Sequence, residues 1–130
     1  MLKILVAEDE PELLQIYQIA LTNSGFDVLP TIDGQICVDA YRAELGKGTD
    51  GVHPPFDLVL LDLRMPKKTG AEAAREILEL CPSQKILMVT AWGGQINLTD
   101  EQLRKITVLE KPVDVDDLID RIKGLTEQRI

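Results

Sequence analysis

Residues 56–66 read Phe-Asp-Leu-Val-Leu-Leu-Asp-Leu-Arg-Met-Pro, an apolar run that ends at Asp62 and is followed by a Met-Pro segment. Continuous apolar runs of this length are typical of strands that are buried on both faces of a parallel sheet. Pro66 cannot continue a strand interior because it has no backbone N–H. The stretch therefore predicts a buried strand over 56–62 that carries a carboxylate, Asp62, to its end.

The same kind of apolar run recurs along the chain and alternates with segments of helical periodicity. The other expected strands cover 2–7, 26–30, 85–90 and 107–109. An alternation of this kind is typical of βα units, in which a parallel sheet is covered by helices on both faces. The sequence therefore predicts an α/β fold with five strands and five helices.

Residues that favour helix starts mark four of these helices. They are Pro11, Asp33, Thr99, which opens a Thr-Asp-Glu-Gln capping box, and Asp114. The remaining helix is expected to end before Pro82. In the first helix, which we expect to stop at Ser24-Gly25, the predicted buried stripe consists of Leu13, Tyr17, Ala20 and Leu21. Residues 45–55 predict a polar surface insertion that is longer than the usual loop of about 4–6 residues.

Composition limits the domain organisation and the class of partner. With 130 residues, 45% of them hydrophobic, the chain has the size of one ordinary domain, and we expect a single domain over 1–130. The net charge of −8 opposes nonspecific binding to nucleic acid or to an anionic membrane. No segment resembles a signal peptide or reaches transmembrane length, so we expect a cytoplasmic protein. A metal ion or a basic partner surface suits this charge better.

Polar side chains follow four of the expected strands, at the point where each strand ends. Glu8 and Asp9 follow the first strand, Asp62 ends the third, Thr90 ends the fourth and Lys111 follows the fifth. In open α/β sheets, binding sites lie beyond the carboxyl ends of the strands. Each of these residues alone has an ordinary explanation as a helix entry, a strand end or a turn. Their joint placement predicts one site.

Carboxylate oxygens dominate this site, and they predict a cation. Mg²⁺ prefers oxygen ligands and usually takes one or two protein carboxylates, which makes Asp9 and Asp62 the expected direct ligands. Zn²⁺ is disfavoured because the single histidine, His53, lies in the insertion. Cys37 and Cys81 have no partner at metal-ligand spacing, so they predict two buried reduced thiols.

An aspartate can also attack phosphorus and become an acyl phosphate, whose added charge needs a metal and positioned donors. Lys111 supplies a point charge for a phosphate oxygen, and Thr90 supplies a hydroxyl. The small side chain of Ala91 leaves its backbone N–H approachable. These residues predict phosphoryl chemistry at Asp62.

The order of these features resembles the receiver domain of bacterial two-component response regulators. Glu8-Asp9 comes first, then residues 58–66 with Gly70 beyond, then Val89-Thr90-Ala91, and last Lys111-Pro112. The match spans nearly the whole chain. It implies a three-layer αβα fold of the flavodoxin-like (CheY-like) type, with a five-stranded parallel sheet in the order 2-1-3-4-5 and five helices.

The resemblance also implies a role for each residue of the site. Asp62 would be the phosphoacceptor, and Thr90 and Lys111 would contact the phosphoryl group. The Mg²⁺ ligands would be Asp62, Asp9, Glu8 through a water molecule, and the backbone carbonyl of Arg64.

The partners implied by the resemblance are proteins. The phosphoryl donor would be a phosphohistidine on a sensor histidine kinase or a phosphotransfer domain, and the output protein or domain is not identified by the sequence. The receiver would catalyse only its own phosphorylation and dephosphorylation. Neither nucleic acid nor membrane would be bound directly.

Three positions depart from the family pattern or modulate it. Where the family has an aromatic residue that rotates during the switch, three positions before the lysine, this chain has Val108. Arg64 and Trp92 stand at positions that line access to the phosphate in the family. Residues 92–97 contain two glycines and predict a mobile loop with a displaced or shortened fourth helix.

Other functions compete with this interpretation. A pseudo-receiver that docks constitutively would explain Val108, but the complete set of acids, threonine and lysine argues against it. An aspartyl-phosphate phosphatase would need an acid two residues after the nucleophile, where Arg64 stands. An FMN carrier would need a phosphate loop after the first strand, where Glu8-Asp9-Glu10 would repel phosphate.

Overall fold

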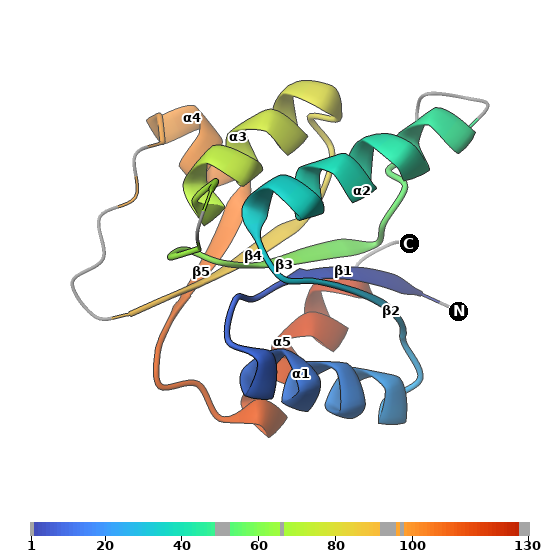
Figure 1. Cartoon of the computed structure of the whole chain (residues 1–130), viewed down its shortest axis with the longest axis vertical. Helices are drawn as coiled ribbons and strands as arrows, with labels where there is room; N and C mark the ends of the chain where they lie inside the picture. The colour runs from blue at the N-terminus through green and yellow to red at the C-terminus, as the bar shows by residue number, and fades with distance from the viewer. Residues whose placement is uncertain (1, 49–52, 66, 92–95, 97, 128–130) are drawn as a thin grey trace.

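The computed structural model describes residues 2–48, 53–65, 67–91, 96 and 98–127, and it has three layers (Figure 1). The middle layer is one parallel sheet in the order β2-β1-β3-β4-β5. Its strands are β1 (Lys3–Ala7), β2 (Asp27–Thr31), β3 (Leu58–Asp62), β4 (Ile86–Thr90) and β5 (Ile106–Glu110). The expected α/β fold, the strand order 2-1-3-4-5 and the five helices are confirmed.

Helices cover both faces of the sheet. In Figure 1, α1 (Pro11–Asn23) and α5 (Val115–Thr126) lie below the sheet, and α2 (Gly34–Lys47), α3 (Gly70–Leu80) and α4 (Asp100–Arg104) lie above it. All five residues of β3 and of β4 are buried, whereas the edge strands β2 and β5 alternate between exposed and half-buried positions and have one buried residue each. Burial on both faces explains why the central strands are continuously apolar.

Two hydrophobic clusters make up the core, one on each face of the sheet. Leu5, Val59 and Leu61 point to the side of α2 and α3, where Ile77 is fully buried. Their chain neighbours Ile4, Val6 and Leu60 point to the other side, toward α1 and α5. The alternation follows from the period of two in a strand, and it fixes the face on which each helix packs.

Helix starts agree with the sequence. Pro11 begins α1, the Asp33 side chain accepts a hydrogen bond from the Ile36 N–H at 2.8 Å, and Asp114 accepts one from the Asp116 N–H at 2.8 Å. The capping box at Thr99 is present with Gln102, and a second one at Thr69, which was not foreseen, begins α3 with Glu72. The expected helix starts at Asp33, Thr99 and Asp114 therefore coincide with capping hydrogen bonds in the structure.

Some expected boundaries are wrong. The helix α2 continues through Lys47, so residues 45–47 do not belong to the insertion, whose described part begins at Gly48. In α1 the buried residues are Leu14, Tyr17 and Leu21, and the expected stripe members Leu13 and Ala20 are only half-buried, packed against the same hydrophobic cluster. Strand β5 is also longer than the expected 107–109.

Both cysteines are free and buried, as expected. Cys37 lies within α2, and Cys81 caps the end of α3 instead of lying inside it. Burial raises the pKa of the Cys37 thiol to about 12, so this thiol stays protonated at neutral pH. The two residues therefore behave as small core side chains.

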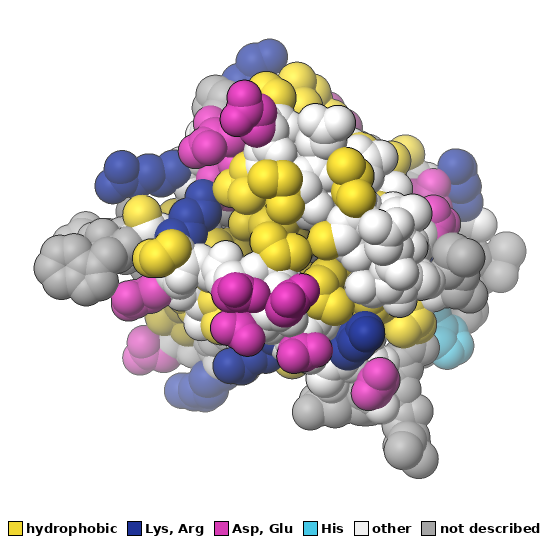
Figure 2. All heavy atoms as spheres, turned by 90° about the horizontal axis from the view of Figure 1, so that it is seen from below, with side chains coloured by type: hydrophobic (Ala, Val, Ile, Leu, Met, Phe, Trp, Pro, Cys, Tyr) yellow, Lys and Arg dark blue, Asp and Glu magenta, His cyan; other side chains and the backbone are white. Residues whose placement is uncertain are grey.

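The face formed by α1 and α5 is chemically mixed. Ile16 and Ile19 are exposed on α1, and Asp116 and Asp117 are exposed in the first turn of α5. Figure 2, which views this face directly, shows hydrophobic side chains in the middle and acidic side chains beside them. None of the helices in the described part of the chain has the length and hydrophobicity to cross a bilayer.

Candidate functional site

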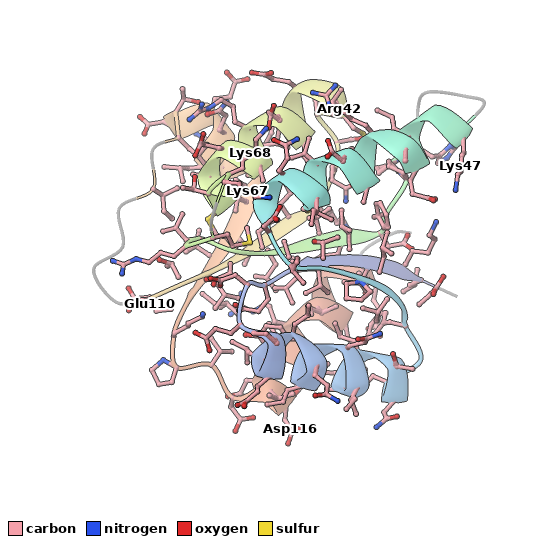
Figure 3. All side chains as sticks on the ribbon, in the orientation of Figure 1. Arg42, Lys47, Lys67, Lys68, Glu110 and Asp116 are labelled. Carbon is pink, nitrogen blue, oxygen red and sulfur yellow. The ribbon has the colours of Figure 1, made fainter. Side chains whose placement is uncertain are left out.

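Four strands bring their carboxyl ends to one edge of the sheet, on the left in Figure 1. In the register of the sheet, Asp62 pairs with Val89, and Thr90 pairs with Glu110. The backbone N–H of Lys111 donates to the carbonyl of Thr90 at 2.7 Å, and the Lys111–Pro112 peptide bond is cis. Figure 3 shows Glu110 at this edge, where β5 ends. Parallel pairing therefore delivers the predicted residues to a common place.

Three carboxylates meet at this edge. One oxygen from each of Glu8, Asp9 and Asp62 lies within 4.8 Å of the others. Glu8 is 1% exposed and Asp62 is 8% exposed, while Asp9 is open to solvent. Like charges this close, two of them buried, repel each other unless a cation or a proton compensates them. The predicted acid cluster is therefore present, and its negative charge requires a neighbouring cation or a proton.

Glu8 is the most constrained of the three acids. Its Oε2 accepts a hydrogen bond from the Glu10 N–H at 3.1 Å. Among the described residues, its Oε1 is the one fully enclosed side-chain polar atom that has no hydrogen-bond partner. Burial raises the pKa of the Glu8 carboxyl to about 7, and the negative charge of Asp62 adds to this, while the Glu10 N–H and Lys111 oppose it. A water molecule bound to a cation would give Oε1 a hydrogen-bond partner.

Lys111 supplies a positive charge to the acids. Its Nζ lies 3.3 Å from Asp62 Oδ1 and 3.7 Å from Glu8 Oε1. Partial burial of the ammonium opposes its charge, but Asp62 and Glu8 outweigh this effect and hold the pKa of Lys111 above its usual value. Lys111 is therefore protonated and lies beside the predicted nucleophile.

Thr90 is buried at the end of β4, and its hydroxyl donates to the carbonyl of Ala91 at 3.2 Å. A threonine hydroxyl can rotate about one bond to exchange this partner for another acceptor. The position of Thr90 at the same edge as Asp62 agrees with the sequence prediction. Its contact with a phosphoryl group stays a prediction.

The segment between β3 and α3 is held by two glycines. A Cβ on Gly70 would overlap the backbone carbonyl oxygen of Asp62, and a Cβ on Gly34 would overlap that of Lys68. Gly70 N–H also donates to the carbonyl of Leu63 at 2.8 Å. The role of Gly34 was missed because the sequence gives no sign that the start of α2 touches this segment.

The side chains of the segment point in different directions. Lys68 forms an ion pair with Glu76 of α3, and Lys67 adopts a left-handed backbone conformation with φ of 67° (Figure 3). Arg64 is exposed two residues after Asp62. The predicted use of its carbonyl as a metal ligand stays a prediction.

Two further expectations concern the output side of the site. Val108 lies on β5 and is 37% exposed, so an aliphatic side chain stands at the position where the resemblance implies a rotating aromatic residue. Trp92 and the loop residues 92–95 and 97 lie outside the described residues. The structure adds Tyr17 to the neighbourhood of Lys111. One sign of this role was visible in the sequence, an aromatic hydroxyl within an aliphatic stripe.

Comparisons with known proteins agree with this architecture. The family model for the response regulator receiver domain matches residues 4–123. The response regulator receiver protein CpdR of Brucella abortus is 30% identical over 126 residues, which cover 96% of this chain and 97% of CpdR.

Solved structures show the same similarity. A response regulator receiver domain protein from Clostridium thermocellum has a TM-score of 0.83 and 25% identity, with 99% of this chain and 97% of that chain covered. CheY of Borrelia burgdorferi, in a complex named as CheX-CheY-BeF3-Mg²⁺, has a TM-score of 0.78 and 25% identity, with 95% and 88% covered.

Proposed function

The chain belongs to the response regulator receiver domain family, and from this premise we propose that Asp62 accepts a phosphoryl group and that the modified chain changes its binding to a partner protein. Receiver domains are regulatory parts of two-component systems and not metabolic enzymes. The observation that carries the proposal is the Lys111 ammonium 3.3 Å from Asp62 Oδ1, next to two more carboxylates. We propose that residues 1–130 act as one receiver domain.

The donor in this proposal is a phosphohistidine of a sensor histidine kinase or a phosphotransfer domain. Asp62 Oδ attacks phosphorus, the bond from phosphorus to the histidine nitrogen breaks, and the electron pair of that bond stays on the nitrogen. The PO₃ group thus moves from nitrogen to oxygen. Lys111 pairs with a phosphoryl oxygen, and the Thr90 hydroxyl turns from the Ala91 carbonyl toward another one.

The donor set fits Mg²⁺. Glu8, Asp9 and Asp62 offer only oxygen atoms, and the enclosed Oε1 of Glu8 has no hydrogen-bond partner among the described residues. We propose that Asp9, Asp62 and the carbonyl of Arg64 bind the ion directly and that Glu8 binds through water. The bound ion would neutralise charge on the phosphoryl oxygens. The Mg²⁺ in the name of the Borrelia complex supports this choice.

The partner proposal rests on the relatives. The Borrelia CheY structure is a complex with another protein, CheX, and we propose that this chain also acts by binding a protein. The net charge of −8 suits a partner surface that carries basic residues.

Incubation with acetyl phosphate and Mg²⁺ tests the proposed function. We expect acid-labile phosphate at a stoichiometry near one in the wild type and none in Asp62→Asn, measured by intact mass. Asp27→Asn is the matched control because Asp27 is an exposed acid of the edge strand β2. Emission of the single tryptophan should respond to Mg²⁺ and then to beryllofluoride, with the second step absent in Asp62→Asn. A wild type that binds neither would instead act as a constitutive docking module.

A further inference from the structure

Lys68, in the segment between β3 and α3, is fixed through both its backbone and its side chain. Its backbone carbonyl packs directly against Gly34, the first residue of α2, where a Cβ would overlap it. Its ammonium forms an ion pair with Glu76 of α3, and the two side chains are only 16% and 30% exposed. Salt and water screen such a pair less than they screen an exposed one. We call these two contacts the Lys68 anchor.

Glu76 has a second cation near it, but Lys68 is the closer partner. Nη2 of Arg42, an exposed residue of α2, lies 4.0 Å from Glu76 Oε1, whereas Lys68 contacts the other oxygen, Oε2. Figure 3 shows Arg42 and Lys68 on the side of the sheet that carries α2 and α3. Exposed ion pairs at the limit of contact contribute little. The Glu76 carboxylate therefore acts mainly on Lys68.

The residue before Lys68 has a backbone conformation that lysine rarely adopts. Lys67 has φ of 67°, and it is the one residue other than glycine with a positive φ in the described part of the chain. A Cβ is crowded in this left-handed region, so a residue stays there only where its surroundings fix the chain. The Lys68 anchor fixes it on one side, and on the other side Met65 is buried in the core.

The same segment carries the backbone carbonyl of Arg64, a proposed ligand of Mg²⁺. The Arg64 side chain is exposed, so it does not fix the position of this carbonyl. A carbonyl lies in the plane of its peptide, and its direction follows from the backbone dihedrals of the segment. Mg²⁺ demands near-ideal octahedral geometry, which makes its binding sensitive to a displaced ligand.

We propose that Lys68 and Glu76 are positioning residues for Mg²⁺, because their ion pair fixes the segment between β3 and α3 so that the Arg64 carbonyl can bind the ion. The inference rests on the proposed function, since it takes Mg²⁺ to bind at the acid cluster. Neither residue belongs to that cluster. The affinity for Mg²⁺ thus depends on an acid of α3 that acts through the backbone.

Lys68→Met distinguishes positioning from a simple effect of charge. Removal of a positive charge near a cation site tightens Mg²⁺ binding if only long-range electrostatics acts. Positioning predicts the opposite sign. We expect Lys68→Met to raise the Kd for Mg²⁺ on the order of tenfold, the lower end of what the loss of a ligand-orienting residue costs. Titration of the metal-free protein with MgCl₂, followed by the emission of the single tryptophan, measures this Kd.

Two control variants make the same changes of charge outside the ion pair. Lys67→Met removes the neighbouring exposed lysine, and Glu79→Gln removes an exposed acid of α3, so both should keep the Kd within about twofold. Glu76→Gln should raise the Kd as Lys68→Met does. The double variant of Lys68→Met and Glu76→Gln should lose no more than either single one, since both remove one interaction.

A second substitution tests whether the backbone conformation is the cause. Glycine adopts the left-handed conformation without crowding, so Lys67→Gly in the Lys68→Met background should lower the raised Kd on the order of threefold. A Kd that is unchanged or lower in Lys68→Met, or a raised Kd that Lys67→Gly does not lower, would overturn the inference.

Phosphorylation of the wild type by acetyl phosphate separates this inference from the proposed function. A wild type that is phosphorylated on Asp62, together with an unchanged Kd in Lys68→Met, would overturn the inference alone. A wild type that binds Mg²⁺ and gains no phosphate would overturn the proposed function and leave the positioning role to be decided by the Kd values. A wild type that does not bind Mg²⁺ would overturn both.

Discussion

Lys111 is the residue on which the charge balance of the site depends. It is the cation that the described residues place against Asp62 and Glu8, at 3.3 Å and 3.7 Å. A bound divalent ion would lie against the same carboxylates. The lysine and the ion therefore compensate the same negative charge, and the loss of one should increase the need for the other.

Lys111→Met tests this relation. We expect it to lower the free energy of unfolding without Mg²⁺ by about 1–3 kcal/mol, because it leaves the buried Glu8 and Asp62 carboxylates without their partner. Mg²⁺ should then raise the unfolding free energy of Lys111→Met more than that of the wild type. Urea unfolding without Mg²⁺, and then with the Mg²⁺ concentration raised in steps of about tenfold, measures both effects.

Lys123→Met is the control for this experiment, because Lys123 is exposed on α5 and its side chain has no bonded partner among the described residues. It should change neither quantity. If Lys111→Met gained no more from Mg²⁺ than the wild type does, the lysine and the ion would not share these carboxylates.

At the scale of elements, the segment from β3 to α3 decides where Asp62 lies. Gly70 is the first residue of α3 and touches the backbone of Asp62, so the helix and the end of the strand are locked together without an intervening side chain. Gly34, the first residue of α2, likewise packs directly against the backbone of Lys68. The geometry of the site thus depends on close backbone packing between three elements.

Gly70→Ala should damage both stability and phosphorylation. Its Cβ would overlap the Asp62 carbonyl, which is backbone and cannot rotate away, so we expect a loss of about 2 kcal/mol or more in unfolding free energy. The rate with acetyl phosphate should also fall, because the end of β3 must shift.

Gly124→Ala is the opposite case. Gly124 lies within α5 with open space around it, and alanine there should stabilise the protein by about 0.5–1 kcal/mol. Equal stability of the two variants would contradict this account.

The sequence predicted elements better than their contacts. The strands, the helix caps and the residues at the strand ends follow from local patterns: apolar runs, capping side chains such as Asp33 and Asp114, and the carboxylate at the end of β3. Contacts between elements leave no such pattern. The packing of Gly34 on Lys68 and the cavity that Tyr17 shares with Lys111 depend on how distant segments meet. The extension of α2 through Lys47 was missed because a glycine, Gly46, lies inside the helix and suggested a loop.

At the scale of the whole molecule, the amino ends and the carboxyl ends of the strands differ in how their polar groups are paired. At the amino ends of the strands, Gln84 is 2% exposed and binds Tyr41, the Phe56 carbonyl and the Lys85 carbonyl, all within 3.0 Å. Lys85 Nζ donates to the Leu125 carbonyl at 2.6 Å and ties α5 to β4. These contacts are satisfied within the chain. At the carboxyl ends, Glu8 Oε1 is enclosed and has no hydrogen-bond partner among the described residues, so it is left for a ligand.

Val108 lies on β5, which pairs with β4, so we expect a change at the carboxyl ends of the strands to reach Val108 through these two strands. Thr90 is the residue of β4 that can exchange a hydrogen bond when Asp62 is modified, and Val108 has no ring to exchange between exposed and buried positions. We therefore expect Thr90→Ala to abolish the change in amide hydrogen exchange of β5 and α4 that beryllofluoride and Mg²⁺ produce in the wild type. Thr90→Ser keeps the hydroxyl and should keep the change. Val108→Ala should also keep it, since no rotation of this side chain is required. Full retention in Thr90→Ala, or loss in Val108→Ala, would place the coupling on β5 instead of on the threonine.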